Sequence, residues 1–149
     1  MATRYLTQYD ASQCVVEVAD FRVTGLGEDM VTGEKSEDYF SPSVGAQGDV
    51  IKNIINNTLG EVTVVVQATC PQKADLMKLA NRRDPFPVWV TNLELGERFG
   101  GTLANLLSAP SISRGAEAED MEFVFQVFDY TVEPTQVDPE HSFNVPELA

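Results

Sequence analysis

The chain has 149 residues, enough for one domain with a hydrophobic core, and its hydrophobic content of 43% is ordinary for a globular protein. Its 23 acidic and 10 basic residues give a formal net charge of −13, which argues against nucleic-acid binding because that binding depends on cationic side chains. No apolar run reaches the ~18 residues of a membrane span, so we expect no membrane partner. The first residues form no apolar signal core, so we expect no Sec export. Two cysteines make no disulfide framework, so we expect two free thiols.

The first part of the chain predicts an arm, two short strands and a second arm. Residues 1–12 are polar with scattered aromatics, which is typical of an extended N-terminal arm. The β-branched run 13–19 and the alternating run 21–24 predict strands. Residues 29–40 have apolar side chains only near their ends and predict an extended, poorly buried hairpin arm.

The middle of the chain predicts two strands and one helix. The short apolar run 50–55 predicts a strand, and the strict alternation of valines over 61–69 predicts a half-buried one. Residues 72–83 follow Pro71, place leucines at helical spacing and carry two arginines at their end, so they predict a helix that Pro85 terminates.

The last part of the chain predicts further strands and a tail. Residues 87–95 predict a strand, whereas 98–108 fit either a strand or a helical turn. Residues 110–113 predict the start of a strand, and 121–132 predict the last one. The proline-rich segment from Glu133 onward predicts an extended tail.

These elements together predict a mainly β fold with seven or eight strands and one helix. The simplest architecture is an antiparallel β-barrel or sandwich flanked by one α-helix, with extended loops and terminal arms. We expect three segments: an N-terminal arm over 1–12, a β-barrel domain over 13–133 and a C-terminal tail over 134–149.

The residues that carry catalysis or bind metals form no recognisable set. The single histidine, His141, lies in the proline-rich tail, where a rigid general base is not expected. Neither cysteine has a metal-ligating neighbour, and no GK[ST] sequence follows the lone GxG at Gly25. We therefore predict no catalytic, cofactor-binding or metal site and no enzyme activity.

The predicted last strand is apolar on both faces, and this feature suggests a contact surface. Phe123, Phe125 and Val127 lie on one face, and the other carries Val124, Phe128, Tyr130 and Val132. Either the helix or the tail covers the second face, or a neighbouring subunit does. The second alternative predicts an inter-subunit strand formed by Phe123, Phe125, Phe128 and Tyr130.

The acidic residues are unevenly distributed along the chain. No Lys or Arg follows Arg114, whereas acidic residues continue to Glu147. Solubility alone is one interpretation, and a surface that repels a polyanion is the other.

Four stretches of the sequence resemble the tail tube proteins of contractile-tailed phages. They are VGAQGDV at 44–50, the β run that follows it, QATCPQKADLMKL at 67–79 and EFVFQVFDYTVE at 122–133. The resemblance implies a β-barrel or sandwich flanked by one helix, in which six-fold rings join their sheets into an inner barrel and stack into a tube. It also implies a structural virion protein of the tail, assembled in the host cytoplasm, through which DNA passes without specific binding.

The resemblance also implies partners and residue roles. The partners are further copies of the chain, a tail sheath protein, and baseplate and tail terminator proteins, with no cofactor. The ring-stacking loop would contain Val44, Gly45, Gly48 and Asp49. Lumen-facing acids would be Glu34, Glu37 and Asp38.

Two other classes of function stay open. One is the tube of a contractile bacteriocin or of a type VI-like secretion system. The other is a small β-barrel enzyme or carbohydrate-binding module, which would expose aromatic platforms, whereas the single tryptophan, Trp89, lies inside a strand pattern.

Overall fold

The computed structural model describes residues 4–135 and 142–145. Its strands are β1 (Arg4–Thr7), β2 (Cys14–Val18), β3 (Phe21–Val23), β4 (Leu26–Lys35), β5 (Phe40–Val44), β6 (Val50–Ile54), β7 (Gly60–Val66), β8 (Phe86–Asn92), β9 (Glu97–Leu106), β10 (Met121–Val127), β11 (Thr131–Pro134) and β12 (Ser142–Val145). Its helix is α1 (Lys73–Lys78), and two 3-10 turns, η1 (Ala11–Gln13) and η2 (Leu79–Asn81), accompany it. His141 lies outside the described residues. None of the described helices is long and apolar enough to cross a membrane.

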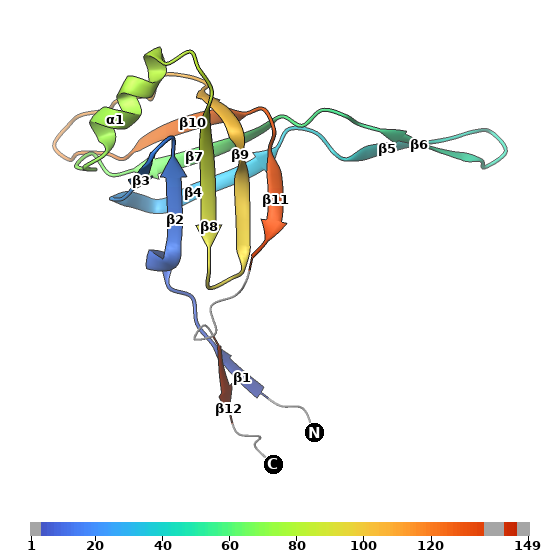
Figure 1. Ribbon diagram of the computed structural model, residues 1–149, viewed down its shortest axis with the longest axis horizontal. Coiled ribbons are helices and arrows are strands. Elements are labelled where there is room, and N and C mark those ends of the chain that lie inside the picture. The colour runs from blue at the N-terminus through green and yellow to red at the C-terminus, as the bar shows by residue number, and fades with distance from the viewer. Residues whose placement is uncertain (1–3, 136–141, 146–149) are drawn as a thin grey trace.

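One eight-stranded antiparallel sheet forms the body of the molecule. Its strand order is β3-β2-β8-β9-β10-β7-β4, and β11 also pairs with β9. Strands β2, β8, β9 and β11 lie side by side along one axis, with alternating directions, and β4, β7 and β10 cross behind them (Figure 1). Strand β9 connects the two layers, because its first residues pair with β11 and its last ones with β10. The two ends of this order, β3 and β4, are not paired with each other in the described structure, so the fold is sandwich-like rather than a closed barrel.

The core lies between the two layers and follows from the alternation of each strand. In β7, Val62, Val64 and Val66 are fully buried, and the residues between them point outward. The rings of Phe86 from β8 and Phe125 from β10 meet edge to face at 6.0 Å. The predicted strand over 61–69 is therefore confirmed, as is the mainly β fold.

Helix α1 lies over the upper end of the sandwich (Figure 1). Leu76 and, in η2, Leu79 are buried against the core, which confirms the predicted helix. The element is shorter than predicted, because the backbone is already extended at Arg82, ahead of Asp84 and Pro85.

The hairpin arm is formed by a different segment from the predicted one. Residues 29–40 were predicted to form it, but most of them belong to β4, which pairs with β7 at the edge of the main sheet. The polar sequence fits there because an edge strand exposes its outward side chains, such as Thr32 and Glu34, to solvent. The arm is instead the β5–β6 hairpin, which projects far from the body (Figure 1).

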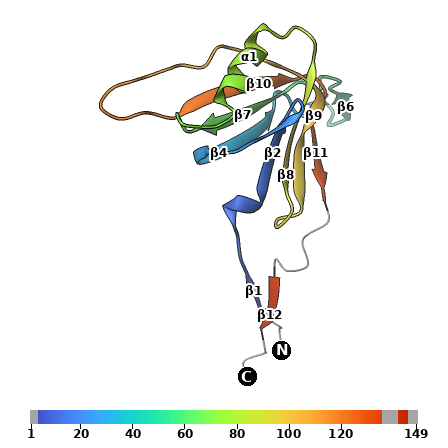
Figure 2. The same ribbon diagram turned by 60° about the vertical axis from the view of Figure 1, so that its left-hand side comes forward.

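Three further predictions are resolved or corrected by the structure. Residues 98–108 form most of a strand, β9, rather than a helical turn. Residues 110–113 form no strand and belong to a long loop between β9 and β10 that extends from the sandwich (Figure 2). Residues 121–132 form two strands, β10 and β11, because the chain turns at Phe128–Tyr130.

The two ends of the chain pair with each other. Strand β1 pairs antiparallel with β12, with Arg4 opposite Val145 and Thr7 opposite Ser142. This two-stranded terminal ribbon extends below the body (Figures 1 and 2). The tail is thus partly in a strand, and its residues 136–141 and 146–149 lie outside the described structure.

Candidate functional site

The β5–β6 arm separates apolar and polar side chains onto its two faces. Residues paired directly across an antiparallel ladder point to the same side. One side, which we call the apolar arm face, therefore consists of Phe40, Pro42, Val44, Val50, Lys52 and Ile54. The opposite side consists of Ser41, Ser43, Ile51 and Asn53. On that side the Asn53 amide donates to the carbonyl oxygen of Ser41 at 3.0 Å and to Oγ of Ser43 at 3.3 Å.

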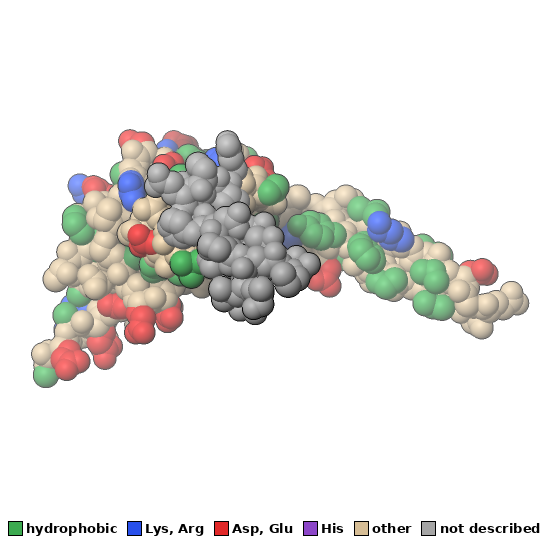
Figure 3. All heavy atoms as spheres, turned by 90° about the horizontal axis from the view of Figure 1, so that it is seen from below, with side chains coloured by type: hydrophobic (Ala, Val, Ile, Leu, Met, Phe, Trp, Pro, Cys, Tyr) green, Lys and Arg blue, Asp and Glu red, His purple; other side chains and the backbone are tan. Residues whose placement is uncertain are grey.

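The apolar arm face is exposed in the protomer. Its large apolar side chains, from Phe40 at 46% to Val44 at 68%, are accessible to solvent. Lys52 places its ammonium 4.8 Å from the centre of the Phe40 ring. Figure 3 shows hydrophobic side chains along the arm up to its tip, while several acidic side chains gather at the opposite end of the molecule. Each large apolar side chain left in water forgoes about 1.5–3 kcal/mol, so this face has the character of a contact surface.

The predicted ring-stacking loop forms the tip of the arm. The amide of Gly45 donates to the carbonyl of Asp49 at 2.8 Å, and that of Gly48 donates to the carbonyl of Gly45 at 3.0 Å. Gly48 adopts a φ of 95°, which a side chain would strain. Val44, Gly45, Gly48 and Asp49 are thus brought together, at the point farthest along the arm.

The predicted lumen acids lie at two different places. Glu34 points outward from β4, directly opposite Glu61 of β7. Glu37 and Asp38 lie at the base of the arm, where Lys35 donates to the carbonyl of Glu37 at 2.7 Å. Like charges directly opposite each other on a sheet are unfavourable, so the Glu34–Glu61 pair is retained at some cost in stability.

The outer face of the β10-β7-β4 layer carries acids and neutral residues only. We call it the acidic sheet face, and its outward side chains are Thr32, Glu34, Glu61, Thr63, Val65, Glu122, Val124 and Gln126. None of these strand residues is basic, and all lie within the described part of the chain. Sequence reasoning missed Glu61 and Glu122, although the alternation of their strands placed them opposite the core valines and phenylalanines.

The outer face of the other layer has a different character. There Glu17 pairs with Arg22, and Glu133 lies opposite Arg98, so both charge signs are present. The Arg98 guanidinium stacks 3.8 Å from the centre of the Trp89 ring. The two outer faces of the sandwich are thus distinguishable by charge.

The predicted inter-subunit strand needs correction. Phe123 and Phe125 are fully buried in the protomer, and Tyr130 is only 7% exposed. Strand β10 also pairs with β7 along its whole length and with β9 over Phe125–Val127, so most of its pairing lies within the protomer. These three side chains are core residues, and among the predicted four only Phe128, 40% exposed in the turn after β10, is open to contact.

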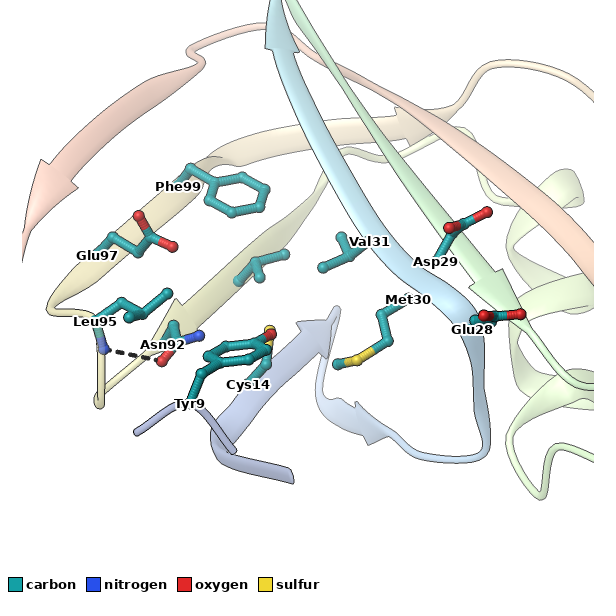
Figure 4. Close-up of a pocket in the computed structure, with 11 residues that line it drawn as sticks. Tyr9, Cys14, Glu28, Asp29, Met30, Val31, Asn92, Leu95, Glu97 and Phe99 are labelled. Carbon is teal, nitrogen blue, oxygen red and sulfur yellow. Dashed lines mark hydrogen bonds between the residues drawn. The ribbon is translucent and has the colours of Figure 1, made fainter. Parts of the chain in front are cut away.

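The lower end of the sandwich opens into a pocket of about 200 Å³ (Figure 4). We call it the lower mouth. Apolar side chains from both layers line it, and carboxylates stand at its rim. Those residues include Tyr9, Met30, Leu95, Phe99, Glu28, Asp29 and Glu97.

The polar groups of the lower mouth include a protonated thiol and hydrogen-bonded turn residues. Burial, and to a smaller extent the negative charge of Glu97, raise the pKa of the Cys14 thiol, which keeps it protonated and unreactive. Asn92 holds the turn beside it by accepting from the amides of Glu94 and Leu95, both at 3.1 Å. The described residues contain no cluster of His, Cys, Asp or Glu that could hold a metal ion.

Glu94 is a buried residue that sequence reasoning did not single out. It is 4% exposed, and its carboxylate accepts from the backbone amide of Asp10 at 2.5 Å and from the side chain of Gln8 at 3.3 Å. These bonds attach the β8–β9 turn to the chain just after β1. Glu94 therefore sets where the terminal ribbon leaves the body.

Comparison with known proteins gives a family and a set of structures with the same fold. The sequence matches the family described as Bacteriophage PhiTE tail tube protein over residues 1–93. A comparison with curated proteins finds no match.

Three solved structures are similar in fold. The anti-feeding prophage cap, described as the AFP tube terminating cap, has a TM-score of 0.64 at 13% identity and covers 87% of this chain and 95% of its own. The PVC sheath/tube terminator of an extracellular contractile injection system has a TM-score of 0.61 at 16% identity, with coverage of 85% and 96%. The PVC sheath-tube complex of such a system has a TM-score of 0.62 at 15% identity, with coverage of 86% and 93%.

At these identities the structural likeness establishes the fold alone. The family match is of a different kind, because it spans well over half of the sequence and includes the arm, β7 and α1. The chain therefore belongs to the Bacteriophage PhiTE tail tube protein family.

Proposed function

We propose that this tail tube protein assembles into six-membered rings that stack into the inner tube of a contractile tail, and that DNA leaves through this tube into the host. The observation that carries the proposal is the apolar arm face, which is exposed in the protomer and is held away from the protomer's own core. A two-stranded hairpin by itself is at best marginally stable in water. The apolar side chains of such an arm are removed from water when a second copy of the chain packs against them.

The arm supports stacking of one ring on the next. Its tip, with Val44, Gly45, Gly48 and Asp49, reaches farthest from the body and would make the first contact with the neighbouring ring. Residues 13–133 would form the body of the ring, with 1–12 and 134–149 as terminal arms.

The acidic sheet face is the surface best suited to line the bore. Glu34, Glu61 and Glu122 would present carboxylates to the phosphates of DNA, and repulsion would keep the DNA from binding as it moves. The repulsive Glu34–Glu61 pair supports this role, because a purely structural face would gain by replacing one of the two. Glu37 and Asp38, at the base of the arm, would extend the negative charge toward the next ring.

The partners follow from the place of a tube in such a tail. They would be further copies of the chain, a sheath protein around the tube, and baseplate and terminator proteins at its ends, in a particle assembled in the host cytoplasm. The mixed-charge outer face around Trp89 and Arg98 differs from the acidic sheet face and is the candidate for the side that faces the sheath.

A second candidate function is the tube of a contractile injection system that carries no genome. The similar solved structures favour it, since they are parts of an anti-feeding prophage and of an extracellular contractile injection system. Isolated particles would separate the two functions, because only a phage tail would be attached to a DNA-filled capsid.

Electron microscopy of the purified chain tests the proposal directly. Negative staining over a range of protein concentrations is expected to show rings or stacked tubes. A sample that stays monomeric at the highest concentrations would contradict the proposal. In a gel-shift assay at physiological salt, duplex DNA is expected to remain unbound, and micromolar binding would refute a repulsive bore.

A further inference from the structure

The lower mouth has the two features that a receptor for the arm needs. Its lining is apolar, and Tyr9 and Leu95 at its opening are 59% and 46% exposed. Its rim carries Glu97 on β9, and Glu28 and Asp29 lie across from it on β4, with their carboxylates turned away from Glu97 (Figure 4). The described residues leave this end of the core open between the two layers.

The arm has the complementary pair of features. Its apolar face carries one charged side chain, the ammonium of Lys52, among Phe40, Pro42, Val44, Val50 and Ile54. Between Phe40 and Ile54 the only other charged residue is Asp49, so the arm has no net charge in a chain whose formal charge is −13. A neutral arm can approach an acidic copy without the repulsion that two bodies would experience.

The arm of a protomer does not reach the lower mouth of the same protomer. In Figure 1 the arm extends sideways from the upper part of the body, whereas the β8–β9 turn, whose residues line the lower mouth, lies at the lower end of the body. A second copy of this chain provides what the mouth would accept, an apolar segment with a centrally placed cation.

We propose that the apolar arm face of one copy docks on the lower mouth of a second copy, with Lys52 against the carboxylate of Glu97. This inference rests on the proposed stacking of rings and specifies its receptor. Apolar contact provides the attraction, and the Lys52 ammonium fixes the register of the arm by pairing with the rim.

Disulfide trapping between two proteins, each with one introduced cysteine, tests the contact. Both proteins carry Cys14→Ser, because Cys14 lies in the mouth. One also carries Val50→Cys on the apolar arm face, and the other carries Leu95→Cys at the mouth. After mixing, assembly and mild oxidation, peptide mapping is expected to identify a disulfide between positions 50 and 95.

The matched control places the cysteine on the other face of the same strand pair. Ser41→Cys, in place of Val50→Cys, is expected to give no disulfide with position 95, since Ser41 points away from the apolar arm face. A disulfide from position 41 and none from position 50 would overturn the proposal, as would tubes in which neither forms.

A charge swap gives an independent readout. Lys52→Glu is expected to raise the protein concentration needed for assembly by about tenfold or more, and adding Glu97→Lys is expected to restore assembly. Lys78→Glu, an equal charge change on α1, is the control and is expected to leave assembly nearly unchanged.

The outcomes separate this inference from the proposed function. Wild-type protein that forms tubes, combined with no 50–95 disulfide in the cysteine-substituted proteins and no effect of Lys52→Glu on assembly, would overturn the docking contact and leave the tube function standing. A wild-type protein that forms neither rings nor tubes would overturn the tube function and the docking contact with it.

Discussion

The arm and the body of this protein are built from the same pattern and differ in what covers it. In the body, the apolar sides of β7 and β10 face the other layer of the sandwich and are buried. In the arm, the apolar side of β5 and β6 shows the same alternation and faces solvent. Alternation thus specifies which side of a strand is apolar, whereas the covering partner is a separate property. In the body the other layer of the sandwich provides this cover, and for the arm we propose that another copy of the chain does.

Replacing a phenylalanine in the body and one in the arm should give the largest difference in protomer stability. Phe125→Ala removes a fully buried ring that contacts Phe86 and is expected to lower the free energy of unfolding by about 3–5 kcal/mol. Phe40→Ala in the arm is expected to change it by less than about 0.5 kcal/mol in the protomer, while weakening assembly. Urea unfolding at low protein concentration measures the first effect, and sedimentation at high concentration measures the second. A large loss of protomer stability from Phe40→Ala would remove the contrast between arm and body.

Replacing a tightly packed glycine of the body should destabilise the fold more than replacing a glycine with open space around it. A Cβ on Gly60 would run into the ring of Tyr130, so Gly60→Ala is expected to cost about 1–3 kcal/mol of unfolding free energy. Gly115, in the β9–β10 loop, has open space around it, and Gly115→Ala serves as the control with little expected effect. Thermal unfolding of both variants measures the difference. Equal melting temperatures would show that Tyr130 moves aside without cost.

The turn that ends β10 should contribute a smaller, pH-dependent amount. Burial raises the pKa of the Asp129 carboxyl, but hydrogen bonds from the Thr102 hydroxyl and from the amides of Leu103 and Thr102 outweigh it and hold that pKa below its ordinary value. Asp129→Asn is therefore expected to cost about 1 kcal/mol of unfolding free energy at neutral pH.

The sign of the pH dependence follows from the lowered pKa of Asp129. The carboxylate stabilises the fold above the unfolded pKa of about 3.9, and this stabilisation is lost as the pH falls through the lower folded pKa. The difference between wild type and Asp129→Asn, measured by urea unfolding, should narrow below about pH 4. An unchanged difference at pH 3 would show that the charge of Asp129 plays no part.

The smallest predicted effect is a gain in stability on the acidic sheet face. Glu34→Gln removes the like-charge contact with Glu61 and is expected to stabilise the protomer by a few tenths of a kcal/mol. Glu119→Gln in the β9–β10 loop removes the same charge where no strand lies opposite and is the control. Urea unfolding of the two variants measures their free energies of unfolding, and only Glu34→Gln is expected to be more stable than wild type. A destabilised Glu34→Gln protein would mean that Glu34 has a structural role.

Several elements were predictable because local physics decides them. The alternating valines of β7 permit only one face to be buried, and the leucine spacing and Pro71 before α1 permit little besides a helix entry. The resemblance to tail tube proteins was likewise visible in stretches that the family match covers, from the arm tip to α1.

Other elements were not predictable because their partners lie far away in the sequence. Residues 29–40 look like an arm, yet pairing with β7 places most of them in the sheet as β4. Val124 and Phe128 suggested a second apolar face on one long strand, whereas the turn held by Asp129 divides that strand in two. The acidic sheet face was missed for the same reason, since Glu34 and Glu61 meet only through the β4–β7 register.

The sequence by itself determined the class of the fold, the place of the helix, the excess of negative charge and the family of the protein. These depend on composition and on neighbours a few residues apart, which a linear pattern contains. Only the tertiary structure decided that the arm is β5–β6, that Phe123 and Phe125 are core residues, and that the acids of three strands share one face. Those properties arise from strand register and layer packing, which bring together residues whose distance along the chain says nothing about their distance in space.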